Sequence, residues 1–256
     1  MVDFWPNFWS TLSLSPSQGI ALAAICFAAG LVRGFTGFAL SAFGLALAVL
    51  IIPPVELIPV MWWLELAASL VMLRHGWGGA DVRAAATLVL GAVFGLFVGL
   101  GLTTSIDPAI SQQVALVVLI SLAVLQLTGT RIPQLGSRAG TIITGVVAGI
   151  VTGLAGIGGM VVALYILARN DEPAVMRATL VAFLFLGSLT SFGMHLWFET
   201  MDTTATLRGL AFVLPCVIGV LIGQRLFTPR LQPYYRPTCL TLLIGLGAVS
   251  LVRSVV

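Results

Sequence analysis

Long apolar stretches alternate with short polar connections along the whole chain. The apolar stretches cover residues 18–52, 55–73, 84–102, 112–128, 139–168, 174–195, 207–227 and 236–252. A helix needs about 20 apolar residues to cross a bilayer, and most of these stretches have that length. Backbone groups in hydrocarbon must be satisfied within the segment, so each stretch is predicted to be helical. The pattern predicts an all-α polytopic membrane protein.

The two longest stretches are interrupted by glycines. Gly30, Gly34 and Gly37 flank Arg33 in the first, and Gly149, Gly153 and Gly156 recur in the fifth at a constant offset of 119. Glycine lowers helix stability by about 1 kcal/mol relative to alanine. An arginine in mid-membrane costs at least about 2.5 kcal/mol. Both helices are therefore predicted to break, near residues 33–38 and 152–159.

Further matches indicate an internal duplication. Pro54 and Pro173 share the offset of 119, and the pair Gly95 and Gly99 matches Gly219 and Gly223 at an offset of 124. Gly91, Gly95 and Gly99 lie on one helix face suited to close packing. The predicted organisation is an interfacial segment at 1–18, a first repeat at 19–128, a linker at 129–138 and a second repeat at 139–256.

The arginines indicate how the repeats face. If all eight stretches cross once, the arginines of the connections divide six against five between the two sides, which gives no orientation. If the first and fifth stretches are re-entrant hairpins, the division becomes nine against two. Cytoplasmic loops carry the excess of arginine, which favours the hairpins. Each repeat is then one hairpin plus three transmembrane helices, and the repeats are inverted with both termini outside. Eight simple crossings are the alternative.

Composition narrows the functional class. The chain is 59% hydrophobic and 8% charged, with a net charge of +3, whereas soluble domains carry about 25% charged residues. It has no basic cluster that would neutralise a nucleic-acid backbone. It also has no nucleophile–base motif, P-loop or paired-cysteine motif, so an enzyme, a metal site and a cofactor are not expected.

Paired broken helices in inverted repeats are typical of secondary transporters. Half-helix ends expose unpaired N–H groups with a partial positive charge. Arg33 adds a full positive charge, and a guanidinium suits an oxyanion. The residues therefore indicate a small-anion transporter, with an anion channel of the same fold, or a carrier of a carboxylate anion, as alternatives.

The two glycine motifs, GLVRGFTGF at 30–38 and GIVTGLAGIGG at 149–159, resemble those of the TauE/SafE (sulfite exporter, or toluenesulfonate uptake permease) family. The resemblance spans about residues 19–252. It implies a multi-pass transporter in the bacterial inner membrane for sulfur-containing anions such as sulfite, sulfoacetate or related organosulfonates. One departure is Arg33, because Thr152 stands at the equivalent position of the second motif.

The residues expected to bind the substrate lie at the two breaks and in the second stretch: Arg33, Gly34, Thr36, Gly37, Ser41, Trp62, Thr152, Gly153, Gly156 and Gly158. For Arg33 the alternative role is a partner of a carboxylate or of helix C-terminal carbonyls. The hydroxyls of Thr36, Ser41 and Thr152 could instead bond to their own helices, and Trp62 could be a packing residue.

Glu65 is the candidate for proton coupling, since burial favours the protonated carboxyl. Neutralising Arg33 is its alternative role. A proton or the membrane potential is expected to drive transport. The expected partners are a small anion and the lipid bilayer, and a homodimer is compatible with the sequence.

Overall fold

In the computed structural model, the described residues are 9–74, 77–128, 137–169, 171, 173–226, 228, 230, 237, 241, 244, 245, 248 and 252. The regular elements in this part are helices, as expected. They are α2 Pro16–Thr36, α3 Leu40–Ala48, α4 Pro54–Leu73, the 3₁₀ helix η1 Trp77–Gly79, α5 Val82–Ser105, α6 Pro108–Leu127, α7 Arg138–Ala155, α8 Gly158–Arg169, α9 Pro173–Trp197 and α10 Thr203–Leu226. The start of the predicted interfacial segment, nearly all of the predicted linker and most of the predicted eighth stretch lie outside the described residues.

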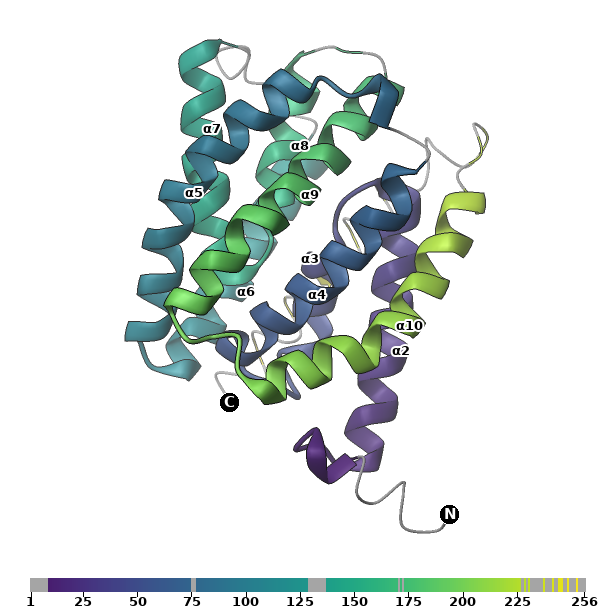
Figure 1. Cartoon of the computed structure of the whole chain (residues 1–256), viewed down its shortest axis with the longest axis vertical. Coiled ribbons are helices and arrows are strands. Elements are labelled where there is room, and N and C mark those ends of the chain that lie inside the picture. The colour runs from purple at the N-terminus through teal and green to yellow at the C-terminus, as the bar shows by residue number, and fades with distance from the viewer. Residues whose placement is uncertain are drawn as a thin grey trace.

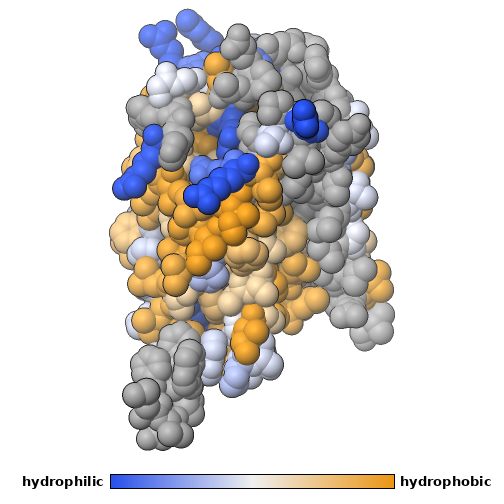
Figure 2. All heavy atoms as spheres, turned by 90° about the vertical axis from the view of Figure 1, so that its right-hand side faces the viewer, coloured by the Kyte–Doolittle hydropathy of each residue, from blue (hydrophilic) through white to orange (hydrophobic). Residues whose placement is uncertain are grey.

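Six of these helices are long and apolar enough to cross a membrane: α2, α4, α5, α7, α9 and α10. Figure 2 shows apolar side chains around the middle of the visible face, with hydrophilic side chains gathered toward one end. This distribution is the one expected of a bundle that sits in a bilayer.

Both predicted breaks are present, and each begins at a left-handed glycine. α2 ends at Gly37, which has a φ of 83°. The backbone N–H of Gly37 donates to the carbonyl of Arg33 at 2.8 Å. α7 ends at Gly156, with φ 67°, and its N–H donates to the carbonyl of Thr152 at 2.7 Å. Glycine adopts this conformation without the steric penalty of a Cβ, which explains why the helices stop at these two residues.

The two arms of each broken segment have unequal lengths. α2 has 21 residues and α3 has 9, whereas α7 has 18 and α8 has 12. The first arm of each is therefore long enough to cross a bilayer. The reason is that Gly30 and Gly34 continue the helix, and only Gly37 ends it.

The earlier motif glycines instead allow close helix packing. A Cβ on Gly30 would lie 2.1 Å from the carbonyl oxygen of Cys216 in α10, and a Cβ on Gly149 would lie 2.1 Å from that of Ala92 in α5. Glycine pairs of this kind let membrane helices approach backbone to backbone. The contacts are equivalent in the two halves, because α2 packs on α10 as α7 packs on α5.

Arg208 joins the beginnings of α2, α4 and α10 at one end of the bundle. These helices begin at the lower end of Figure 1. From the first turns of α10 the guanidinium of Arg208 donates to the carbonyls of Leu12 at 2.7 Å and Ser13 at 3.3 Å, just before α2. It also pairs at 2.7 Å with Glu56 in the first turn of α4. The broken segment α2–α3 therefore starts and finishes at this end, called here the N-terminal end.

Arg169 has the corresponding position at the opposite end. It is the last residue of α8 and pairs at 2.7 Å with Asp81, which caps the start of α5. The backbone N–H of Asp81 donates to Thr179 in α9 at 2.9 Å, and Tyr165 of α8 hydrogen-bonds Thr141 in the first turn of α7 at 3.0 Å. The broken segment α7–α8 therefore starts and finishes at the end opposite to that of α2–α3.

Candidate functional site

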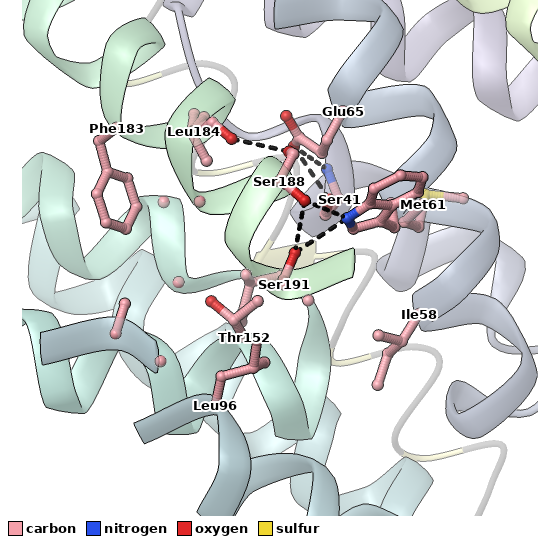
Figure 3. Close-up of a pocket in the computed structure, with 18 of the residues that line it drawn as sticks. Ser41, Ile58, Met61, Glu65, Leu96, Thr152, Phe183, Leu184, Ser188 and Ser191 are labelled. Atoms are coloured by element: carbon pink, nitrogen blue, oxygen red, sulfur yellow. Dashed lines mark hydrogen bonds between the residues drawn. The ribbon is translucent and has the colours of Figure 1, made fainter. Parts of the chain in front are cut away.

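A cavity of about 80 Å³, called here the inner cavity, lies where the two helix breaks meet. The breaks touch, because a Cβ on Gly156 would lie 3.8 Å from the side chain of Ser41. The cavity is lined from α4, α5 and α9 as well as from both breaks, and Figure 3 shows side chains from these elements turned toward it. A space of this size holds a few water molecules or one small solute.

The structure brings some of the predicted site residues to this cavity and leaves others behind its wall. The cavity-lining set is Ser41, Trp62, Glu65, Thr152, Gly156 and Gly158. The remaining predicted residues, Arg33, Gly34, Thr36, Gly37 and Gly153, do not line it. Gly34 and Gly153 lie in the helix contacts, against Val220 and Gly99 respectively. The hydroxyl of Thr36 donates to the carbonyls of Val32 and Phe38.

Arg33 is completely buried within the first broken segment. Its Nη1 donates to the carbonyl of Gly37, and its Nη2 donates to Ser69 Oγ at 3.0 Å. Nη2 also lies 3.5 Å from Oε2 of Glu65. A cation at a helix C-terminus interacts favourably with the last carbonyls and with the dipole. Arg33 therefore has both partners that the alternative interpretation assigned to it.

Glu65 connects Arg33 to the start of α3. Its Oε1 accepts hydrogen bonds from Ser41, through the backbone N–H at 3.3 Å and through Oγ at 3.0 Å. Ser41 is in the first turn of α3, where backbone N–H groups have no partner within the helix. The carboxylate is thus an anion held at a helix N-terminus, and it also faces the cavity. The ion-pair alternative for Glu65 is present, and its role in proton coupling stays a prediction.

The second break differs chemically from the first. Applying the offset of 119, the residue that matches Glu65 is Leu184. Leu184 lies over the start of α8, with its Cδ2 3.2 Å from the place of a Cβ on Gly159. Thr152 donates to the carbonyl of Ala148 at 2.7 Å, and its hydroxyl oxygen would meet a Cβ on Gly158 at 2.1 Å. A carboxylate thus faces the start of α3, whereas a leucine faces the start of α8.

Trp62 forms one wall of the cavity. Its Nε1 donates to the carbonyl of Ser188 and to Ser191 Oγ, both at 2.9 Å, and its ring stacks on Phe192 with centroids 5.2 Å apart. The bond to Ser191 joins α4 to α9, and polar side chains commonly form such bonds between membrane helices. The sequence reasoning missed His195 as a lining residue. A signal was present, because Ser188, Ser191 and His195 recur at helical spacing on one face of α9.

Arg177 also contacts the first break. It belongs to α9, and its Nη2 donates to the carbonyl of Gly34 at 2.7 Å. Its Cγ also lies 3.0 Å from the place of a Cβ on Gly37. Two arginines, Arg33 and Arg177, therefore bind carbonyls at the end of α2.

Asp81 lies outside the membrane-spanning segments and caps α5. The hydrogen bond from the N–H of Ala84 lowers the pKa of its carboxyl, against the effect of partial burial, and pairing with Arg169 lowers it further. The carboxylate is therefore the form that holds α5 to the end of α8.

Together, the membrane-length helices and the two glycine breaks around a shared cavity define a multi-pass membrane protein of the transporter class. The chain belongs to the sulfite exporter TauE/SafE family, whose model matches residues 22–250. Family and helices together indicate the inner membrane as its location. No curated protein matches the chain, and no solved structure matches it.

Proposed function

We propose that the protein is a secondary transporter that carries a small sulfur-containing anion, such as sulfite, sulfoacetate or a related organosulfonate, across the inner membrane. The cavity between the two breaks is its binding site. Family membership supports the class of substrate. The position of the cavity supports the site, since it lies between the starts of two short helices inside an apolar bundle.

The difference between the two breaks is the observation that carries the site. At the start of α3 the carboxylate of Glu65 already supplies a negative charge. At the start of α8 the matching residue is Leu184, which cannot accept a hydrogen bond. Helix N-termini bind anions through their first N–H groups and the helix dipole. The substrate anion therefore binds at the start of α8, near Gly158 and Thr152.

Alternating access between inverted repeats is the proposed mechanism. It is supported by the equivalent packing of α2 on α10 and of α7 on α5. The two broken segments support it further. Each starts and finishes at the same end of the bundle, α2–α3 at the N-terminal end and α7–α8 at the opposite end. Most described arginines, including Arg83, Arg138 and Arg225, belong to the end opposite the N-terminal end, which makes that opposite end cytoplasmic.

Glu65 is the proposed coupling group. An anion in the cavity is repelled by the ionised carboxylate, and protonation of Glu65 removes this repulsion. A proton and the anion therefore travel together in this mechanism. Arg33, behind the wall, holds the carboxylate in place between turnovers.

A matched pair of substitutions at Leu184 tests the site. Leu184→Glu places a carboxylate over the start of α8, in imitation of Glu65, and should reduce anion affinity at least about tenfold at pH 8. Leu184→Gln has the same size without the charge and should bind within a few-fold of the wild type. Affinity is measured by titration of the purified protein with sulfite and sulfoacetate. Equal affinities for the two variants would contradict an anion site at α8.

A further inference from the structure

A second and larger cavity lies at the N-terminal end of the bundle. Its volume is about 390 Å³, and it is lined by the starts of α4 and α10, the end of α5 and the connection at 198–202. Its lining includes the polar residues Glu56, Thr104, Thr200, Asp202 and Arg208. This second cavity is called the vestibule below.

An apolar partition separates the vestibule from the inner cavity. Ile58, Leu96 and Leu100 form a buried hydrophobic cluster apart from the main core, and Met194 and Phe198 pack against it. Ile58 and Leu96 also line the inner cavity, where they lie away from Glu65 (Figure 3), whereas Phe198 lines the vestibule. These five residues are called the plug.

The order of residues along the helices places the plug between the two cavities. Along α5 the cavity-lining Leu96 is followed by Leu100 and then by Thr103, which lines the vestibule. Along α4 the vestibule residue Glu56 precedes Ile58 by half a turn. An anion cannot cross such an apolar layer without losing its hydration, so the plug closes this route in the present conformation.

One polar contact crosses the same partition. His195 lines the inner cavity and is buried, with only 1% of its surface exposed. Its Nδ1 lies 2.9 Å from Oγ1 of Thr200, a residue that lines the vestibule. Thr200 also hydrogen-bonds the carbonyl of His195, through N–H at 3.0 Å and through Oγ1 at 3.2 Å. These bonds tie the connection at 198–202 to the end of α9.

We propose that the plug is the gate of the N-terminal end and that the contact between His195 and Thr200 is its latch. The proposal rests on the proposed transport function, for which it names the route to the binding site. Opening moves the end of α9 and the residues 198–202 away from α4 and α5. The inner cavity then becomes continuous with the vestibule, whose walls already carry polar groups. His195 is a positioning residue in this device.

Cysteine accessibility tests the route. In a background with Cys26, Cys216 and Cys239 replaced by alanine, Thr152→Cys reports on the inner cavity and Thr104→Cys on the vestibule. A charged, membrane-impermeant methanethiosulfonate reagent is added to each side of sealed vesicles in turn. Thr104→Cys should react from one side only, which identifies the side that the vestibule faces.

The gate is then widened by substitution. Leu96→Ala should raise the rate at which Thr152→Cys reacts from the vestibule side by at least about tenfold, and Thr200→Val should raise it as well. Leu88→Ala is the matched control, because Leu88 is fully buried in the same helix but belongs to the main core. Leu88→Ala should change the reaction rate of Thr152→Cys by no more than about twofold.

An unchanged rate in Leu96→Ala, with Thr104→Cys reacting readily, would overturn the gate. An equal increase in Leu88→Ala would overturn it too, since general loosening would then explain the effect. The reaction needs no substrate. If Leu96→Ala admits the reagent but the wild-type protein neither binds nor carries a sulfur anion, the proposed function fails and the route stands.

Discussion

Gly95 is the position where the helix packing makes the strongest prediction about stability. A Cβ there would lie 1.9 Å from the carbonyl oxygen of Val146, whereas ordinary contact begins at 3.4 Å. α5 and α7 would therefore have to separate by about 1.5 Å at this point. A gap of even 0.5–1 Å loses about a quarter to a half of the dispersion energy of each affected contact.

The expected cost follows from two opposing effects. Overpacking costs about 1–3 kcal/mol, and the upper value applies because backbone cannot rotate out of the way. Alanine regains up to about 1 kcal/mol of helix propensity. Gly95→Ala should thus destabilise the protein by about 2 kcal/mol. Unfolding of the purified protein in mixed detergent micelles, as the fraction of denaturing detergent rises, measures this free energy.

Gly193→Ala is the matched control for this substitution. Gly193 lies within α9, and a Cβ there would meet nothing within 4 Å. The same chemical change should therefore stabilise the protein by up to about 1 kcal/mol. If Gly95→Ala and Gly193→Ala shift the free energy of unfolding equally, the result contradicts the close backbone contact between α5 and α7.

Two further predictions concern charged pairs. Glu65→Leu should destabilise the protein by about 3 kcal/mol, because Arg33 is then buried without its carboxylate partner. Adding Arg33→Met should restore most of the lost stability. Strictly additive effects of the two substitutions on unfolding in detergent would argue against the ion pair. Asp81→Asn should lower the melting temperature near pH 6, and this difference should shrink as the pH falls below about 3.9 and through the lower folded pKa of Asp81. The lowered pKa of Asp81 stabilises the fold above the unfolded value of about 3.9, and this stability is lost as the pH falls through the folded pKa. A difference in melting temperature that does not shrink as the pH falls below about 3.9 would contradict the charge effect.

The sequence predicted the breaks well because their cause is local. Gly37 and Gly156 adopt left-handed conformations that glycine tolerates, and a repeated motif marks both. The packing face of Gly91, Gly95 and Gly99 was likewise visible as helical spacing. Both features depend only on residues close together in the chain.

The lining of the cavity was harder to predict because it depends on tertiary contacts. Arg33 and Glu65 are 32 residues apart, and sequence alone left open whether Arg33 faces a substrate or a carboxylate. Its fully buried position depends on the packing of α2 against its neighbours, which the sequence does not specify. His195 was overlooked because it lies at a helix end, and its bond to Thr200 appears only when the connection after α9 is built.

Binding of anions to the purified wild-type protein tests the central claim most directly. A thermal-shift screen would compare sulfite, thiosulfate, sulfate, sulfoacetate and isethionate with taurine, which is zwitterionic, and with neutral and cationic molecules of similar size. The account predicts that one or more of the sulfur-containing anions raises the melting temperature in a saturable manner, and that Leu184→Glu abolishes the shift. Stabilisation by a neutral or cationic ligand instead of an anion would contradict it.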